Sequence, residues 1–149
     1  MSVFHRILVA YDGSHDSEAA LELATALARD QRARLTVLTV VPDVAGAVTS
    51  VAAGPYDLEA FYGGLQRSAQ DAVPADVSVT MLLQHGSPAQ KITAAADGHD
   101  LVVMGTHGRG RLGEALAGSV SRAVVHALRG AVLLPRAPAS QPEPNAEPD

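Results

Sequence analysis

The chain has 149 residues, about the length of one domain, with 16 acidic and 11 basic side chains and a formal net charge of −5. This charge balance argues against nucleic-acid binding, and the absence of cysteine excludes disulfides, thiol nucleophiles and cysteine zinc sites. No apolar stretch approaches the roughly 20 residues of a membrane span and no signal-peptide pattern opens the chain, so we expect a cytoplasmic protein that contacts no membrane.

The first part of the chain predicts a strand, a helix and a second strand. The apolar run 7–10 stops at an Asp-Gly turn, after which Ser14 or Asp16 can cap a helix. Residues 35–41 form a second β-branched run, which Pro42 ends. Between these strands, the helical spacing predicts an apolar face made of Ala19, Ala20, Leu23, Ala26 and Leu27.

The middle of the chain predicts a second helix and a third strand. Residues 57–71 have a helical pattern that Gly63 and Gly64 weaken. Residues 77–83 alternate as strands do, and one face would carry Val77, Val79 and Met81.

Two more helices and two more strands complete the pattern. Ser87 and Pro88 supply a cap and a first-turn proline to a helix that runs through Ala96. Apolar strands are expected at 101–104 and 131–134, and they flank a helix at 118–128.

Five strands alternating with four helices predict a single α/β domain over residues 1–136. We expect a doubly wound parallel sheet with the strand order 3-2-1-4-5, whose carboxyl edge binds ligands after strands one and four. The small-residue insert at 42–55 is either a surface loop or a lid. The Pro-rich acidic tail at 137–149 is expected to be disordered.

The segment after the fourth strand, MGTHGRGRLGEALAGSVS at 104–121, carries most of the functional signal. Its glycines let the main chain approach a ligand, and their N–H groups can line an anion nest. A helix then begins at Gly118-Ser119-Val120, where free N–H donors and the positive end of the helix dipole favour a phosphate. Two side chains inside the loop can add positive charge, His107 and Arg109. The segment predicts a triphosphate ligand, with a merely flexible glycine loop as the alternative.

Three stretches of this sequence resemble the universal stress protein family. The spacing Gly105-x2-Gly108-x9-Gly118-Ser119 is similar to the ATP-binding signature of that family. The opening RILVAYDGSHDSEAALELA resembles its first strand, acidic turn and first helix, and DLVVMGTHGRG resembles its fourth strand and loop. The similarity extends over residues 4–136 and indicates the ATP-binding branch of the family.

The resemblance implies a site for ATP, possibly accompanied by Mg²⁺. Asp12 would lie near the ribose and adenine and is the weak candidate for the metal, or else it is a turn residue bonded to its own main chain. Val40 or Val41 would contact the adenine through the main chain, or else belongs to the core. Arg109 is either a phosphate partner or a solvated loop charge. The candidate site residues are Ala10, Tyr11, Asp12, Val40, Met104, Gly105, His107, Gly108, Arg109, Gly118, Ser119 and Val120.

The sequence shows no catalytic machinery, because it has neither an acid cluster for two metals nor an evident base near the phosphates. We therefore expect a regulatory, stress-response module that binds ATP and hydrolyses it slowly at most. Two alternatives stay open, an interaction protein of the same fold that binds no nucleotide and a nucleotidyl-transfer enzyme on a related sheet. The resemblance also implies a homodimer through residues 131–134, although Pro135 shortens that strand. The sequence names no other protein partner.

Overall fold

The computed structural model describes residues 2–43, 55–106 and 118–136. Most of the predicted insert and the whole predicted tail, residues 44–54 and 137–149, lie outside the described residues. In the part of the chain that is described, no helix has both the length and the apolar character needed to cross a membrane.

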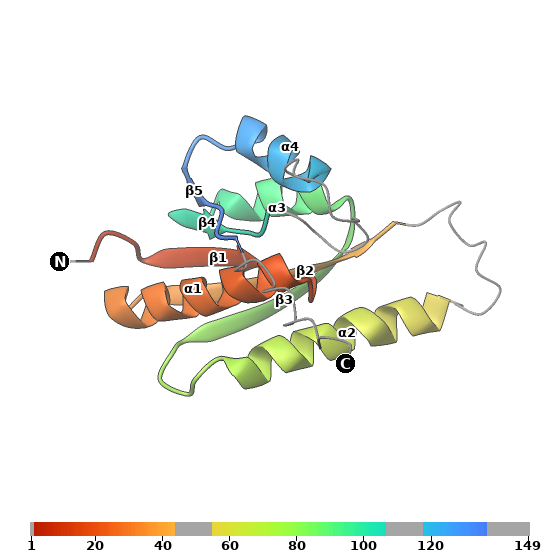
Figure 1. The fold of residues 1–149 in the computed structure, drawn as a ribbon, viewed down its shortest axis with the longest axis horizontal. Coiled ribbons are helices and arrows are strands. Elements are labelled where there is room, and N and C mark those ends of the chain that lie inside the picture. Colours follow the sequence, from red (N-terminus) through yellow and green to blue (C-terminus); the bar gives the residue numbers. More distant parts are fainter. Residues whose placement is uncertain (1, 44–54, 107–117, 137–149) are drawn as a thin grey trace, which may run out of the picture.

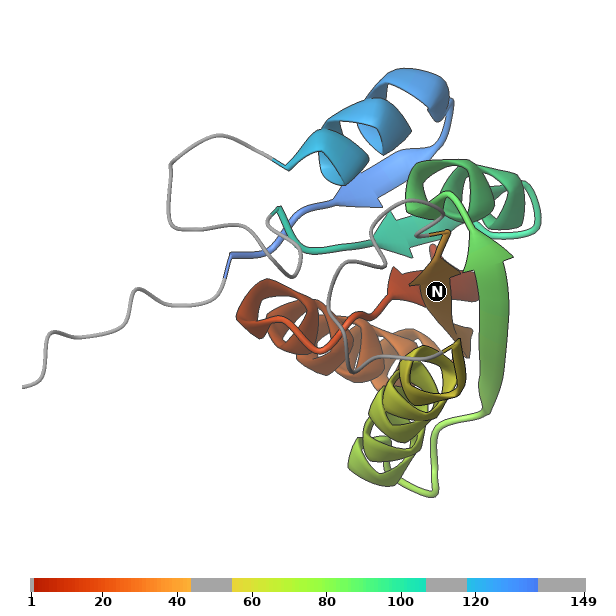
Figure 2. The same cartoon turned by 90° about the vertical axis from the view of Figure 1, so that its right-hand side faces the viewer.

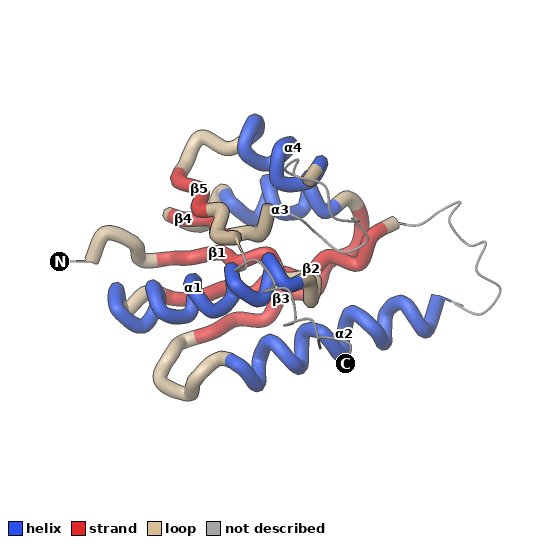
Figure 3. The backbone as a smooth tube through the Cα atoms, in the orientation of Figure 1, coloured by secondary structure: helices blue, strands red, loops and turns tan. Residues whose placement is uncertain are grey.

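Within the described residues, five strands alternate with four helices (Figures 1 and 3). The strands are β1 (Arg6–Ala10), β2 (Arg34–Pro42), β3 (Val79–Gly86), β4 (Leu101–Val103) and β5 (Ala131–Leu133). The helices are α1 (His15–Gln31), α2 (Pro55–Ala72), α3 (Pro88–Ala96) and α4 (Ser119–Ala127). Every strand pair is parallel and the order is β3-β2-β1-β4-β5, so the predicted doubly wound sheet is confirmed.

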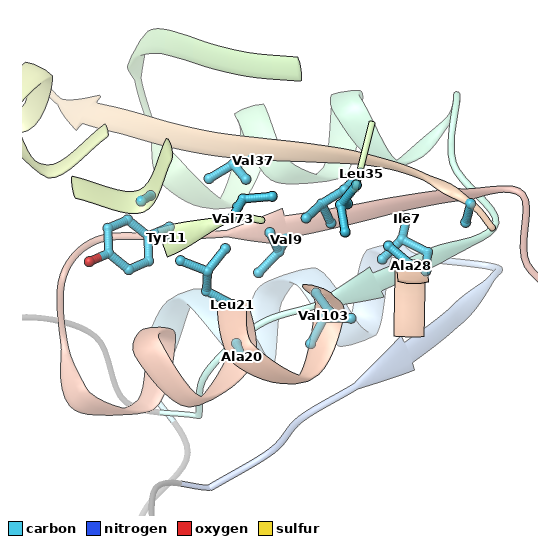
Figure 4. Close-up of a cluster of buried hydrophobic side chains, with 14 of the residues drawn as sticks. Ile7, Val9, Tyr11, Ala20, Leu21, Ala28, Leu35, Val37, Val73 and Val103 are labelled. Atoms are coloured by element: carbon cyan, nitrogen blue, oxygen red, sulfur yellow. The ribbon is translucent and has the colours of Figure 1, made fainter. Parts of the chain in front are cut away.

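The sheet lies between two pairs of helices, with α1 and α2 on one face and α3 and α4 on the other (Figures 1 and 2). The central strand β1 divides its side chains between two cores. Ile7 and Val9 join the cluster beneath α1 and α2, part of which Figure 4 shows, whereas Leu8 joins the cluster beneath α3 and α4. Both faces are covered, which explains why the central strands β1 and β4 are apolar without polar alternation.

The buried face of α1 differs from the predicted one. Its fully buried residues are Ser17, Ala20, Leu21, Ala24 and Ala28, so that Ala20 alone is shared with the predicted set. Ala26, which was expected inside, is exposed. This helix is rich in alanine and has apolar residues on several faces, so periodicity alone did not determine its rotation. Small side chains turn toward the sheet and allow close packing.

Several predicted element boundaries also differ, and those of the third strand differ most, predicted at 77–83 and observed at Val79–Gly86. The sequence predicts that the second strand stops before Pro42. In the structure Pro42 belongs to β2 as its last residue, and it is paired with Gly86 of β3. The main-chain N–H and C=O groups of successive residues point to opposite sides of a strand. The Tyr11 N–H bonds to the carbonyl of Leu38, so in β2 it is the even-numbered residues whose N–H and C=O groups point toward β1. Because β1 ends at Ala10, the missing N–H of Pro42 leaves no ladder partner unsatisfied.

The second helix is longer than predicted and runs without a break through Gly63 and Gly64. Ala69 and Val73 are buried in the cluster beneath α1 and α2, and Leu65 packs against it. Burial of this apolar stripe stabilises the helix despite the low helix propensity of its two glycines.

A carboxylate fixes the amino end of the sheet. Asp100, just before β4, accepts hydrogen bonds from the main-chain N–H groups of His5 (2.7 Å) and Arg6 (2.9 Å) at the start of β1. These two bonds, of which the one from His5 has the larger effect, hold the pKa of the Asp100 carboxyl below its ordinary value of 3.8. They join two strands that are 94 residues apart in the sequence.

We predict that the Asp100→Asn variant has a lower melting temperature than the wild type at neutral pH, because a neutral amide oxygen is a weaker acceptor for these N–H groups. The folded-state pKa is lowered, so the stabilisation is fully present above the ordinary pKa of 3.8 and is lost as the pH falls through the lower folded-state pKa. Thermal melts at several pH values should therefore show the two proteins converging in acid. Asp97→Asn, at an exposed carboxylate nearby, should leave the melting temperature unchanged. A constant difference at all pH values would contradict this account.

Candidate functional site

A cavity of about 260 Å³ opens at the carboxyl ends of β1, β2 and β4. β1 and β4 are neighbours, and at this edge the chain leads from β1 toward β2 on one side and from β4 toward β5 on the other. Ligands of doubly wound sheets bind at such a switch point. The first and fourth strands do supply the loops around this cavity, as the sequence predicts.

The cavity brings together the predicted site residues that the structure describes. They come from four separate segments of the chain and are Ala10, Tyr11, Asp12, Val40, Met104, Gly105, Gly118, Ser119 and Val120. The other three predicted residues, His107, Gly108 and Arg109, lie outside the described residues.

The turn after β1 is held by hydrogen bonds between neighbours. Asp12 Oδ1 accepts from the N–H of Ser14 at 2.9 Å, and Ser14 Oγ caps α1 by accepting from the N–H of Ser17 at 3.2 Å. The buried Ser17 hydroxyl donates to the carbonyl of Ser14 and accepts from the N–H of Asp12. Asp12 is thus a turn residue that also lines the cavity, so these two interpretations are compatible.

Thr106 connects the two ends of the glycine-rich segment. Its hydroxyl donates to Asp16 Oδ2 in α1 at 2.9 Å. Its carbonyl accepts from the Gly118 N–H at 2.6 Å and from the Ser121 hydroxyl at 3.2 Å. The expectation that Gly118 offers a free N–H was therefore wrong. This N–H instead closes the loop and holds the start of α4 beside the end of β4.

The start of α4 differs from those of α1 and α3. Ser14 and Ser87 cap α1 and α3 through their hydroxyls, whereas Gly118 at the start of α4 provides no capping side chain. The first intrahelical donor of α4 is the N–H of Arg122, which bonds to the carbonyl of Gly118. Three preceding N–H groups have no acceptor among the described residues, and they belong to Ser119, Val120 and Ser121. All three residues line the cavity, so the positive end of this helix faces it.

The main chain of Val40 offers a donor and an acceptor at the same cavity. The pairing of β1 with β2 ends at Ala10 and Leu38, and the Tyr11 N–H makes one further bond to the carbonyl of Leu38. β2 continues for four more residues against β3. By alternation, the N–H and carbonyl of Val40 face the side from which β1 has departed. They are placed to bond to the edge of a flat polar group.

Gly105 permits the close approach of β4 to α1. A Cβ atom at this position would lie 2.6 Å from the Asp16 Cβ and 2.8 Å from the Asp16 carbonyl carbon. Such distances are too short for any side chain. The first glycine of the signature therefore has a packing role as well as a place in the cavity wall.

Sequence reasoning missed half of the described residues that line the cavity. They are Ser14, Ser17, Leu38, Pro42, Tyr62, Pro88, Ile92, Thr106 and Ser121. Some had a usable signal, since Ser14 and Pro88 mark helix starts that must follow strands at the carboxyl edge. Tyr62 had none, because it lies inside a helix and its direction depends on packing.

Among the described residues that line the cavity, Asp12 has the one charged side chain. The described chain also holds no group of three or more His, Cys, Asp or Glu residues able to bind a metal ion. The cavity is otherwise apolar toward β2 and α3, and rich in hydroxyls toward α1 and α4. An anion would thus contact main-chain N–H groups and hydroxyls at one end of the cavity, and an apolar ring would pack against apolar side chains at the other.

Comparison with known proteins places this geometry in context. A model of the universal stress protein family matches residues 4–136. A universal stress protein of Thermus aquaticus is 37% identical over 147 residues, covering 90% of this chain and 100% of the relative. A universal stress protein of Mycobacterium tuberculosis is 35% identical over 136 residues, covering 87% of this chain. The chain spans 45% of that relative's length.

Two solved structures show the same fold. A universal stress protein in complex with cAMP has a TM-score of 0.69 and 24% identity, covering 91% of this chain and 99% of the other. The universal stress protein from Archaeoglobus fulgidus in complex with dAMP has a TM-score of 0.67 and 20% identity, with coverages of 89% and 98%.

We predict that the Gly105→Ala variant is less stable than the wild type by about 1–3 kcal/mol, the usual cost of overpacking a tight contact. Urea unfolding measures this difference. Gly98→Ala is the matched control, because a Cβ atom there would meet no atom within 4 Å. Its stability should equal or slightly exceed that of the wild type. Equal stability of the Gly105→Ala protein and the wild type would contradict the packing role.

Proposed function

The chain belongs to the universal stress protein family, and we propose that its cavity binds an adenine nucleotide, with ATP as the principal ligand. The start of α4 carries this proposal. Its three N–H groups without a described acceptor line the cavity, and no side chain caps them. A phosphate supplies the negative oxygens that such a helix start favours.

The shape of the cavity supports one orientation of the nucleotide. The phosphates would lie at Ser119, Val120 and Ser121, and the adenine edge would bond to the main chain of Val40. The ribose would then lie between them, near Asp12. The solved relatives described above hold cAMP and dAMP, which both contain adenine and a phosphate, and this supports an adenine nucleotide as the ligand class.

We assign the remaining predicted contacts to the same site. His107 and Arg109 would add positive charge at the phosphates, and Gly108 would allow the loop to approach them. Asp12 is the described carboxylate at which an Mg²⁺ ion bound to the phosphates would find a ligand. The proposed role is regulatory, in response to stress in the cytoplasm. The protein would act by binding the nucleotide, and it would hydrolyse the nucleotide slowly at most.

A homodimer through β5 is the second part of the proposal. β5 forms one edge of the sheet, and it pairs only with β4 among the described residues. Leu133 on this strand is 37% exposed, and Val125 on α4, the helix that precedes β5, is 45% exposed. An unpaired apolar edge strand is a ready site for pairing with a second copy.

To test nucleotide binding, we compare the Ser119→Glu and Ser119→Gln variants, which differ in charge but hardly in size. A carboxylate in the first turn of α4 favours the helix by about 0.3–1 kcal/mol, yet it repels a phosphate. ATP should raise the melting temperature of the wild type by mass action, raise that of the Gln variant partly, and leave the Glu variant unchanged. Thermal melts at millimolar ATP, with and without Mg²⁺, measure these shifts.

Two results of that experiment would count against the proposal. Absence of any shift in the wild type would favour an interaction protein that binds no nucleotide. Equal shifts in the Glu and Gln variants would show that the phosphates bind away from α4. The melting temperature of the unliganded Glu variant serves as the folding control, and it should equal or exceed that of the wild type.

For the dimer, we predict that Leu133→Lys produces a folded monomer, because a lysine on an edge strand opposes pairing with another chain. Native mass spectrometry of the wild type and the variant reports the oligomeric state. Val3→Lys, at a residue that is 71% exposed outside β5, should remain dimeric. A Leu133→Lys variant that stays dimeric would place the interface elsewhere.

A further inference from the structure

α2 contributes one residue to the cavity within the described part of the chain, and this residue is Tyr62. The sheet-facing side of α2 passes through Leu65 and Ala69, which pack beneath the helix. Tyr62 lies three residues before Leu65 and seven before Ala69, so it continues the same stripe toward the carboxyl edge of the sheet. At this edge the cavity begins, and Tyr62 lines it.

The main chain of Val40 fixes how a base would lie in this cavity. A ring that bonds by its edge to a strand lies close to the plane of the sheet, as another strand would. Its two faces then point toward the two helix layers. On the side of α3, the cavity wall is formed by Pro88 and Ile92. On the opposite side, Tyr62 of α2 lines the cavity together with Tyr11, just after the end of β1.

A neighbouring ring supports the orientation of Tyr62. The centroids of the Phe61 and Tyr62 rings are 5.3 Å apart, and the ring planes are perpendicular. This edge-to-face arrangement is one of the favoured geometries for two aromatic side chains. Phe61 itself is 43% exposed and does not line the cavity, so it contacts Tyr62 from outside.

We propose that Tyr62 is the aromatic wall on which the nucleotide base stacks, opposite the apolar side chains of α3. This inference rests on the proposed function, because it assumes that a nucleotide occupies the cavity with its base at Val40. It adds a determinant of base binding that no glycine-loop signature contains. Aromatic rings hold bases through their π faces, and truncating such a ring weakens binding severalfold or more.

Isothermal titration with ATP tests the inference on four proteins: the wild type, Tyr62→Ala, Tyr62→Phe and Phe61→Ala. We expect the Kd of Tyr62→Ala to rise about tenfold, in the range for the loss of one stacked ring. Tyr62→Phe keeps the ring and should stay within about twofold of the wild type. Phe61→Ala is the matched control, and its Kd should change less than about threefold, because the cavity wall stays intact.

The outcomes separate this inference from the proposed function. If the wild type binds ATP and Tyr62→Ala binds it equally well, the stacking inference is wrong and the nucleotide site stands. If Tyr62→Phe is as weak as Tyr62→Ala, the hydroxyl matters and stacking does not. If all four proteins fail to bind ATP, the proposed function is wrong, and the stacking inference that rests on it is wrong too. Circular dichroism and melting of the unliganded variants verify that each one is folded.

Discussion

The contact between Gly105 and the first turn of α1 is the constraint on which the rest of the site depends. Because no Cβ atom separates them, Thr106 comes close enough to donate its hydroxyl to Asp16. The carbonyl of Thr106 then receives the N–H of Gly118 and the hydroxyl of Ser121. One glycine thus sets the position of β4 against α1, and through Thr106 it sets the position of α4. A larger residue at position 105 would clash with Asp16 and disturb the contacts of Thr106 that hold the start of α4.

The cavity joins two ends of different chemistry. At the α4 end, main-chain N–H groups and hydroxyls can hold an anion with little help from charged side chains among the described residues. At the β2 end, the early departure of β1 leaves the donor and acceptor of Val40 beside apolar walls. Both features follow from the doubly wound order, which places the ends of β1, β2 and β4 at one edge. The fold therefore suits the proposed ligand, which has a flat polar ring at one end and phosphates at the other.

Much of the fold could be predicted from the sequence, because its local signals agree with the tertiary structure. Ser87 and Pro88 mark the start of α3 correctly, and the strands of the sheet appear as apolar runs at nearly the right positions. The rotation of α1 could not be predicted, since a helix rich in alanine presents several apolar faces. The unbroken course of α2 through two glycines was also missed, because its stability comes from burial against the sheet.

In the candidate site, too, local sequence signals predicted some features, whereas others depend on tertiary packing. Glycine spacing led to Gly105 in the cavity wall and to the start of α4, since glycines are needed where the main chain approaches another group closely. That spacing could not show that the Gly118 N–H is used inside the protein, because this depends on where Thr106 points. Tyr62 was invisible for a related reason. Whether a tyrosine inside a helix faces the core, the solvent or a cavity is determined only when the helix packs on the sheet.

The most direct test of the nucleotide site is NMR of the ¹⁵N-labelled protein during titration with ATP. The amide N–H signals of Ser119, Val120 and Ser121 should shift most, because these groups would bond to phosphate oxygens. The signal of Val40 should shift with them, at the same ATP concentrations, because the proposed ligand would contact both ends of the cavity. Saturating ATP that leaves these four amides unmoved, or that shifts signals only in another part of the sheet, would contradict the account.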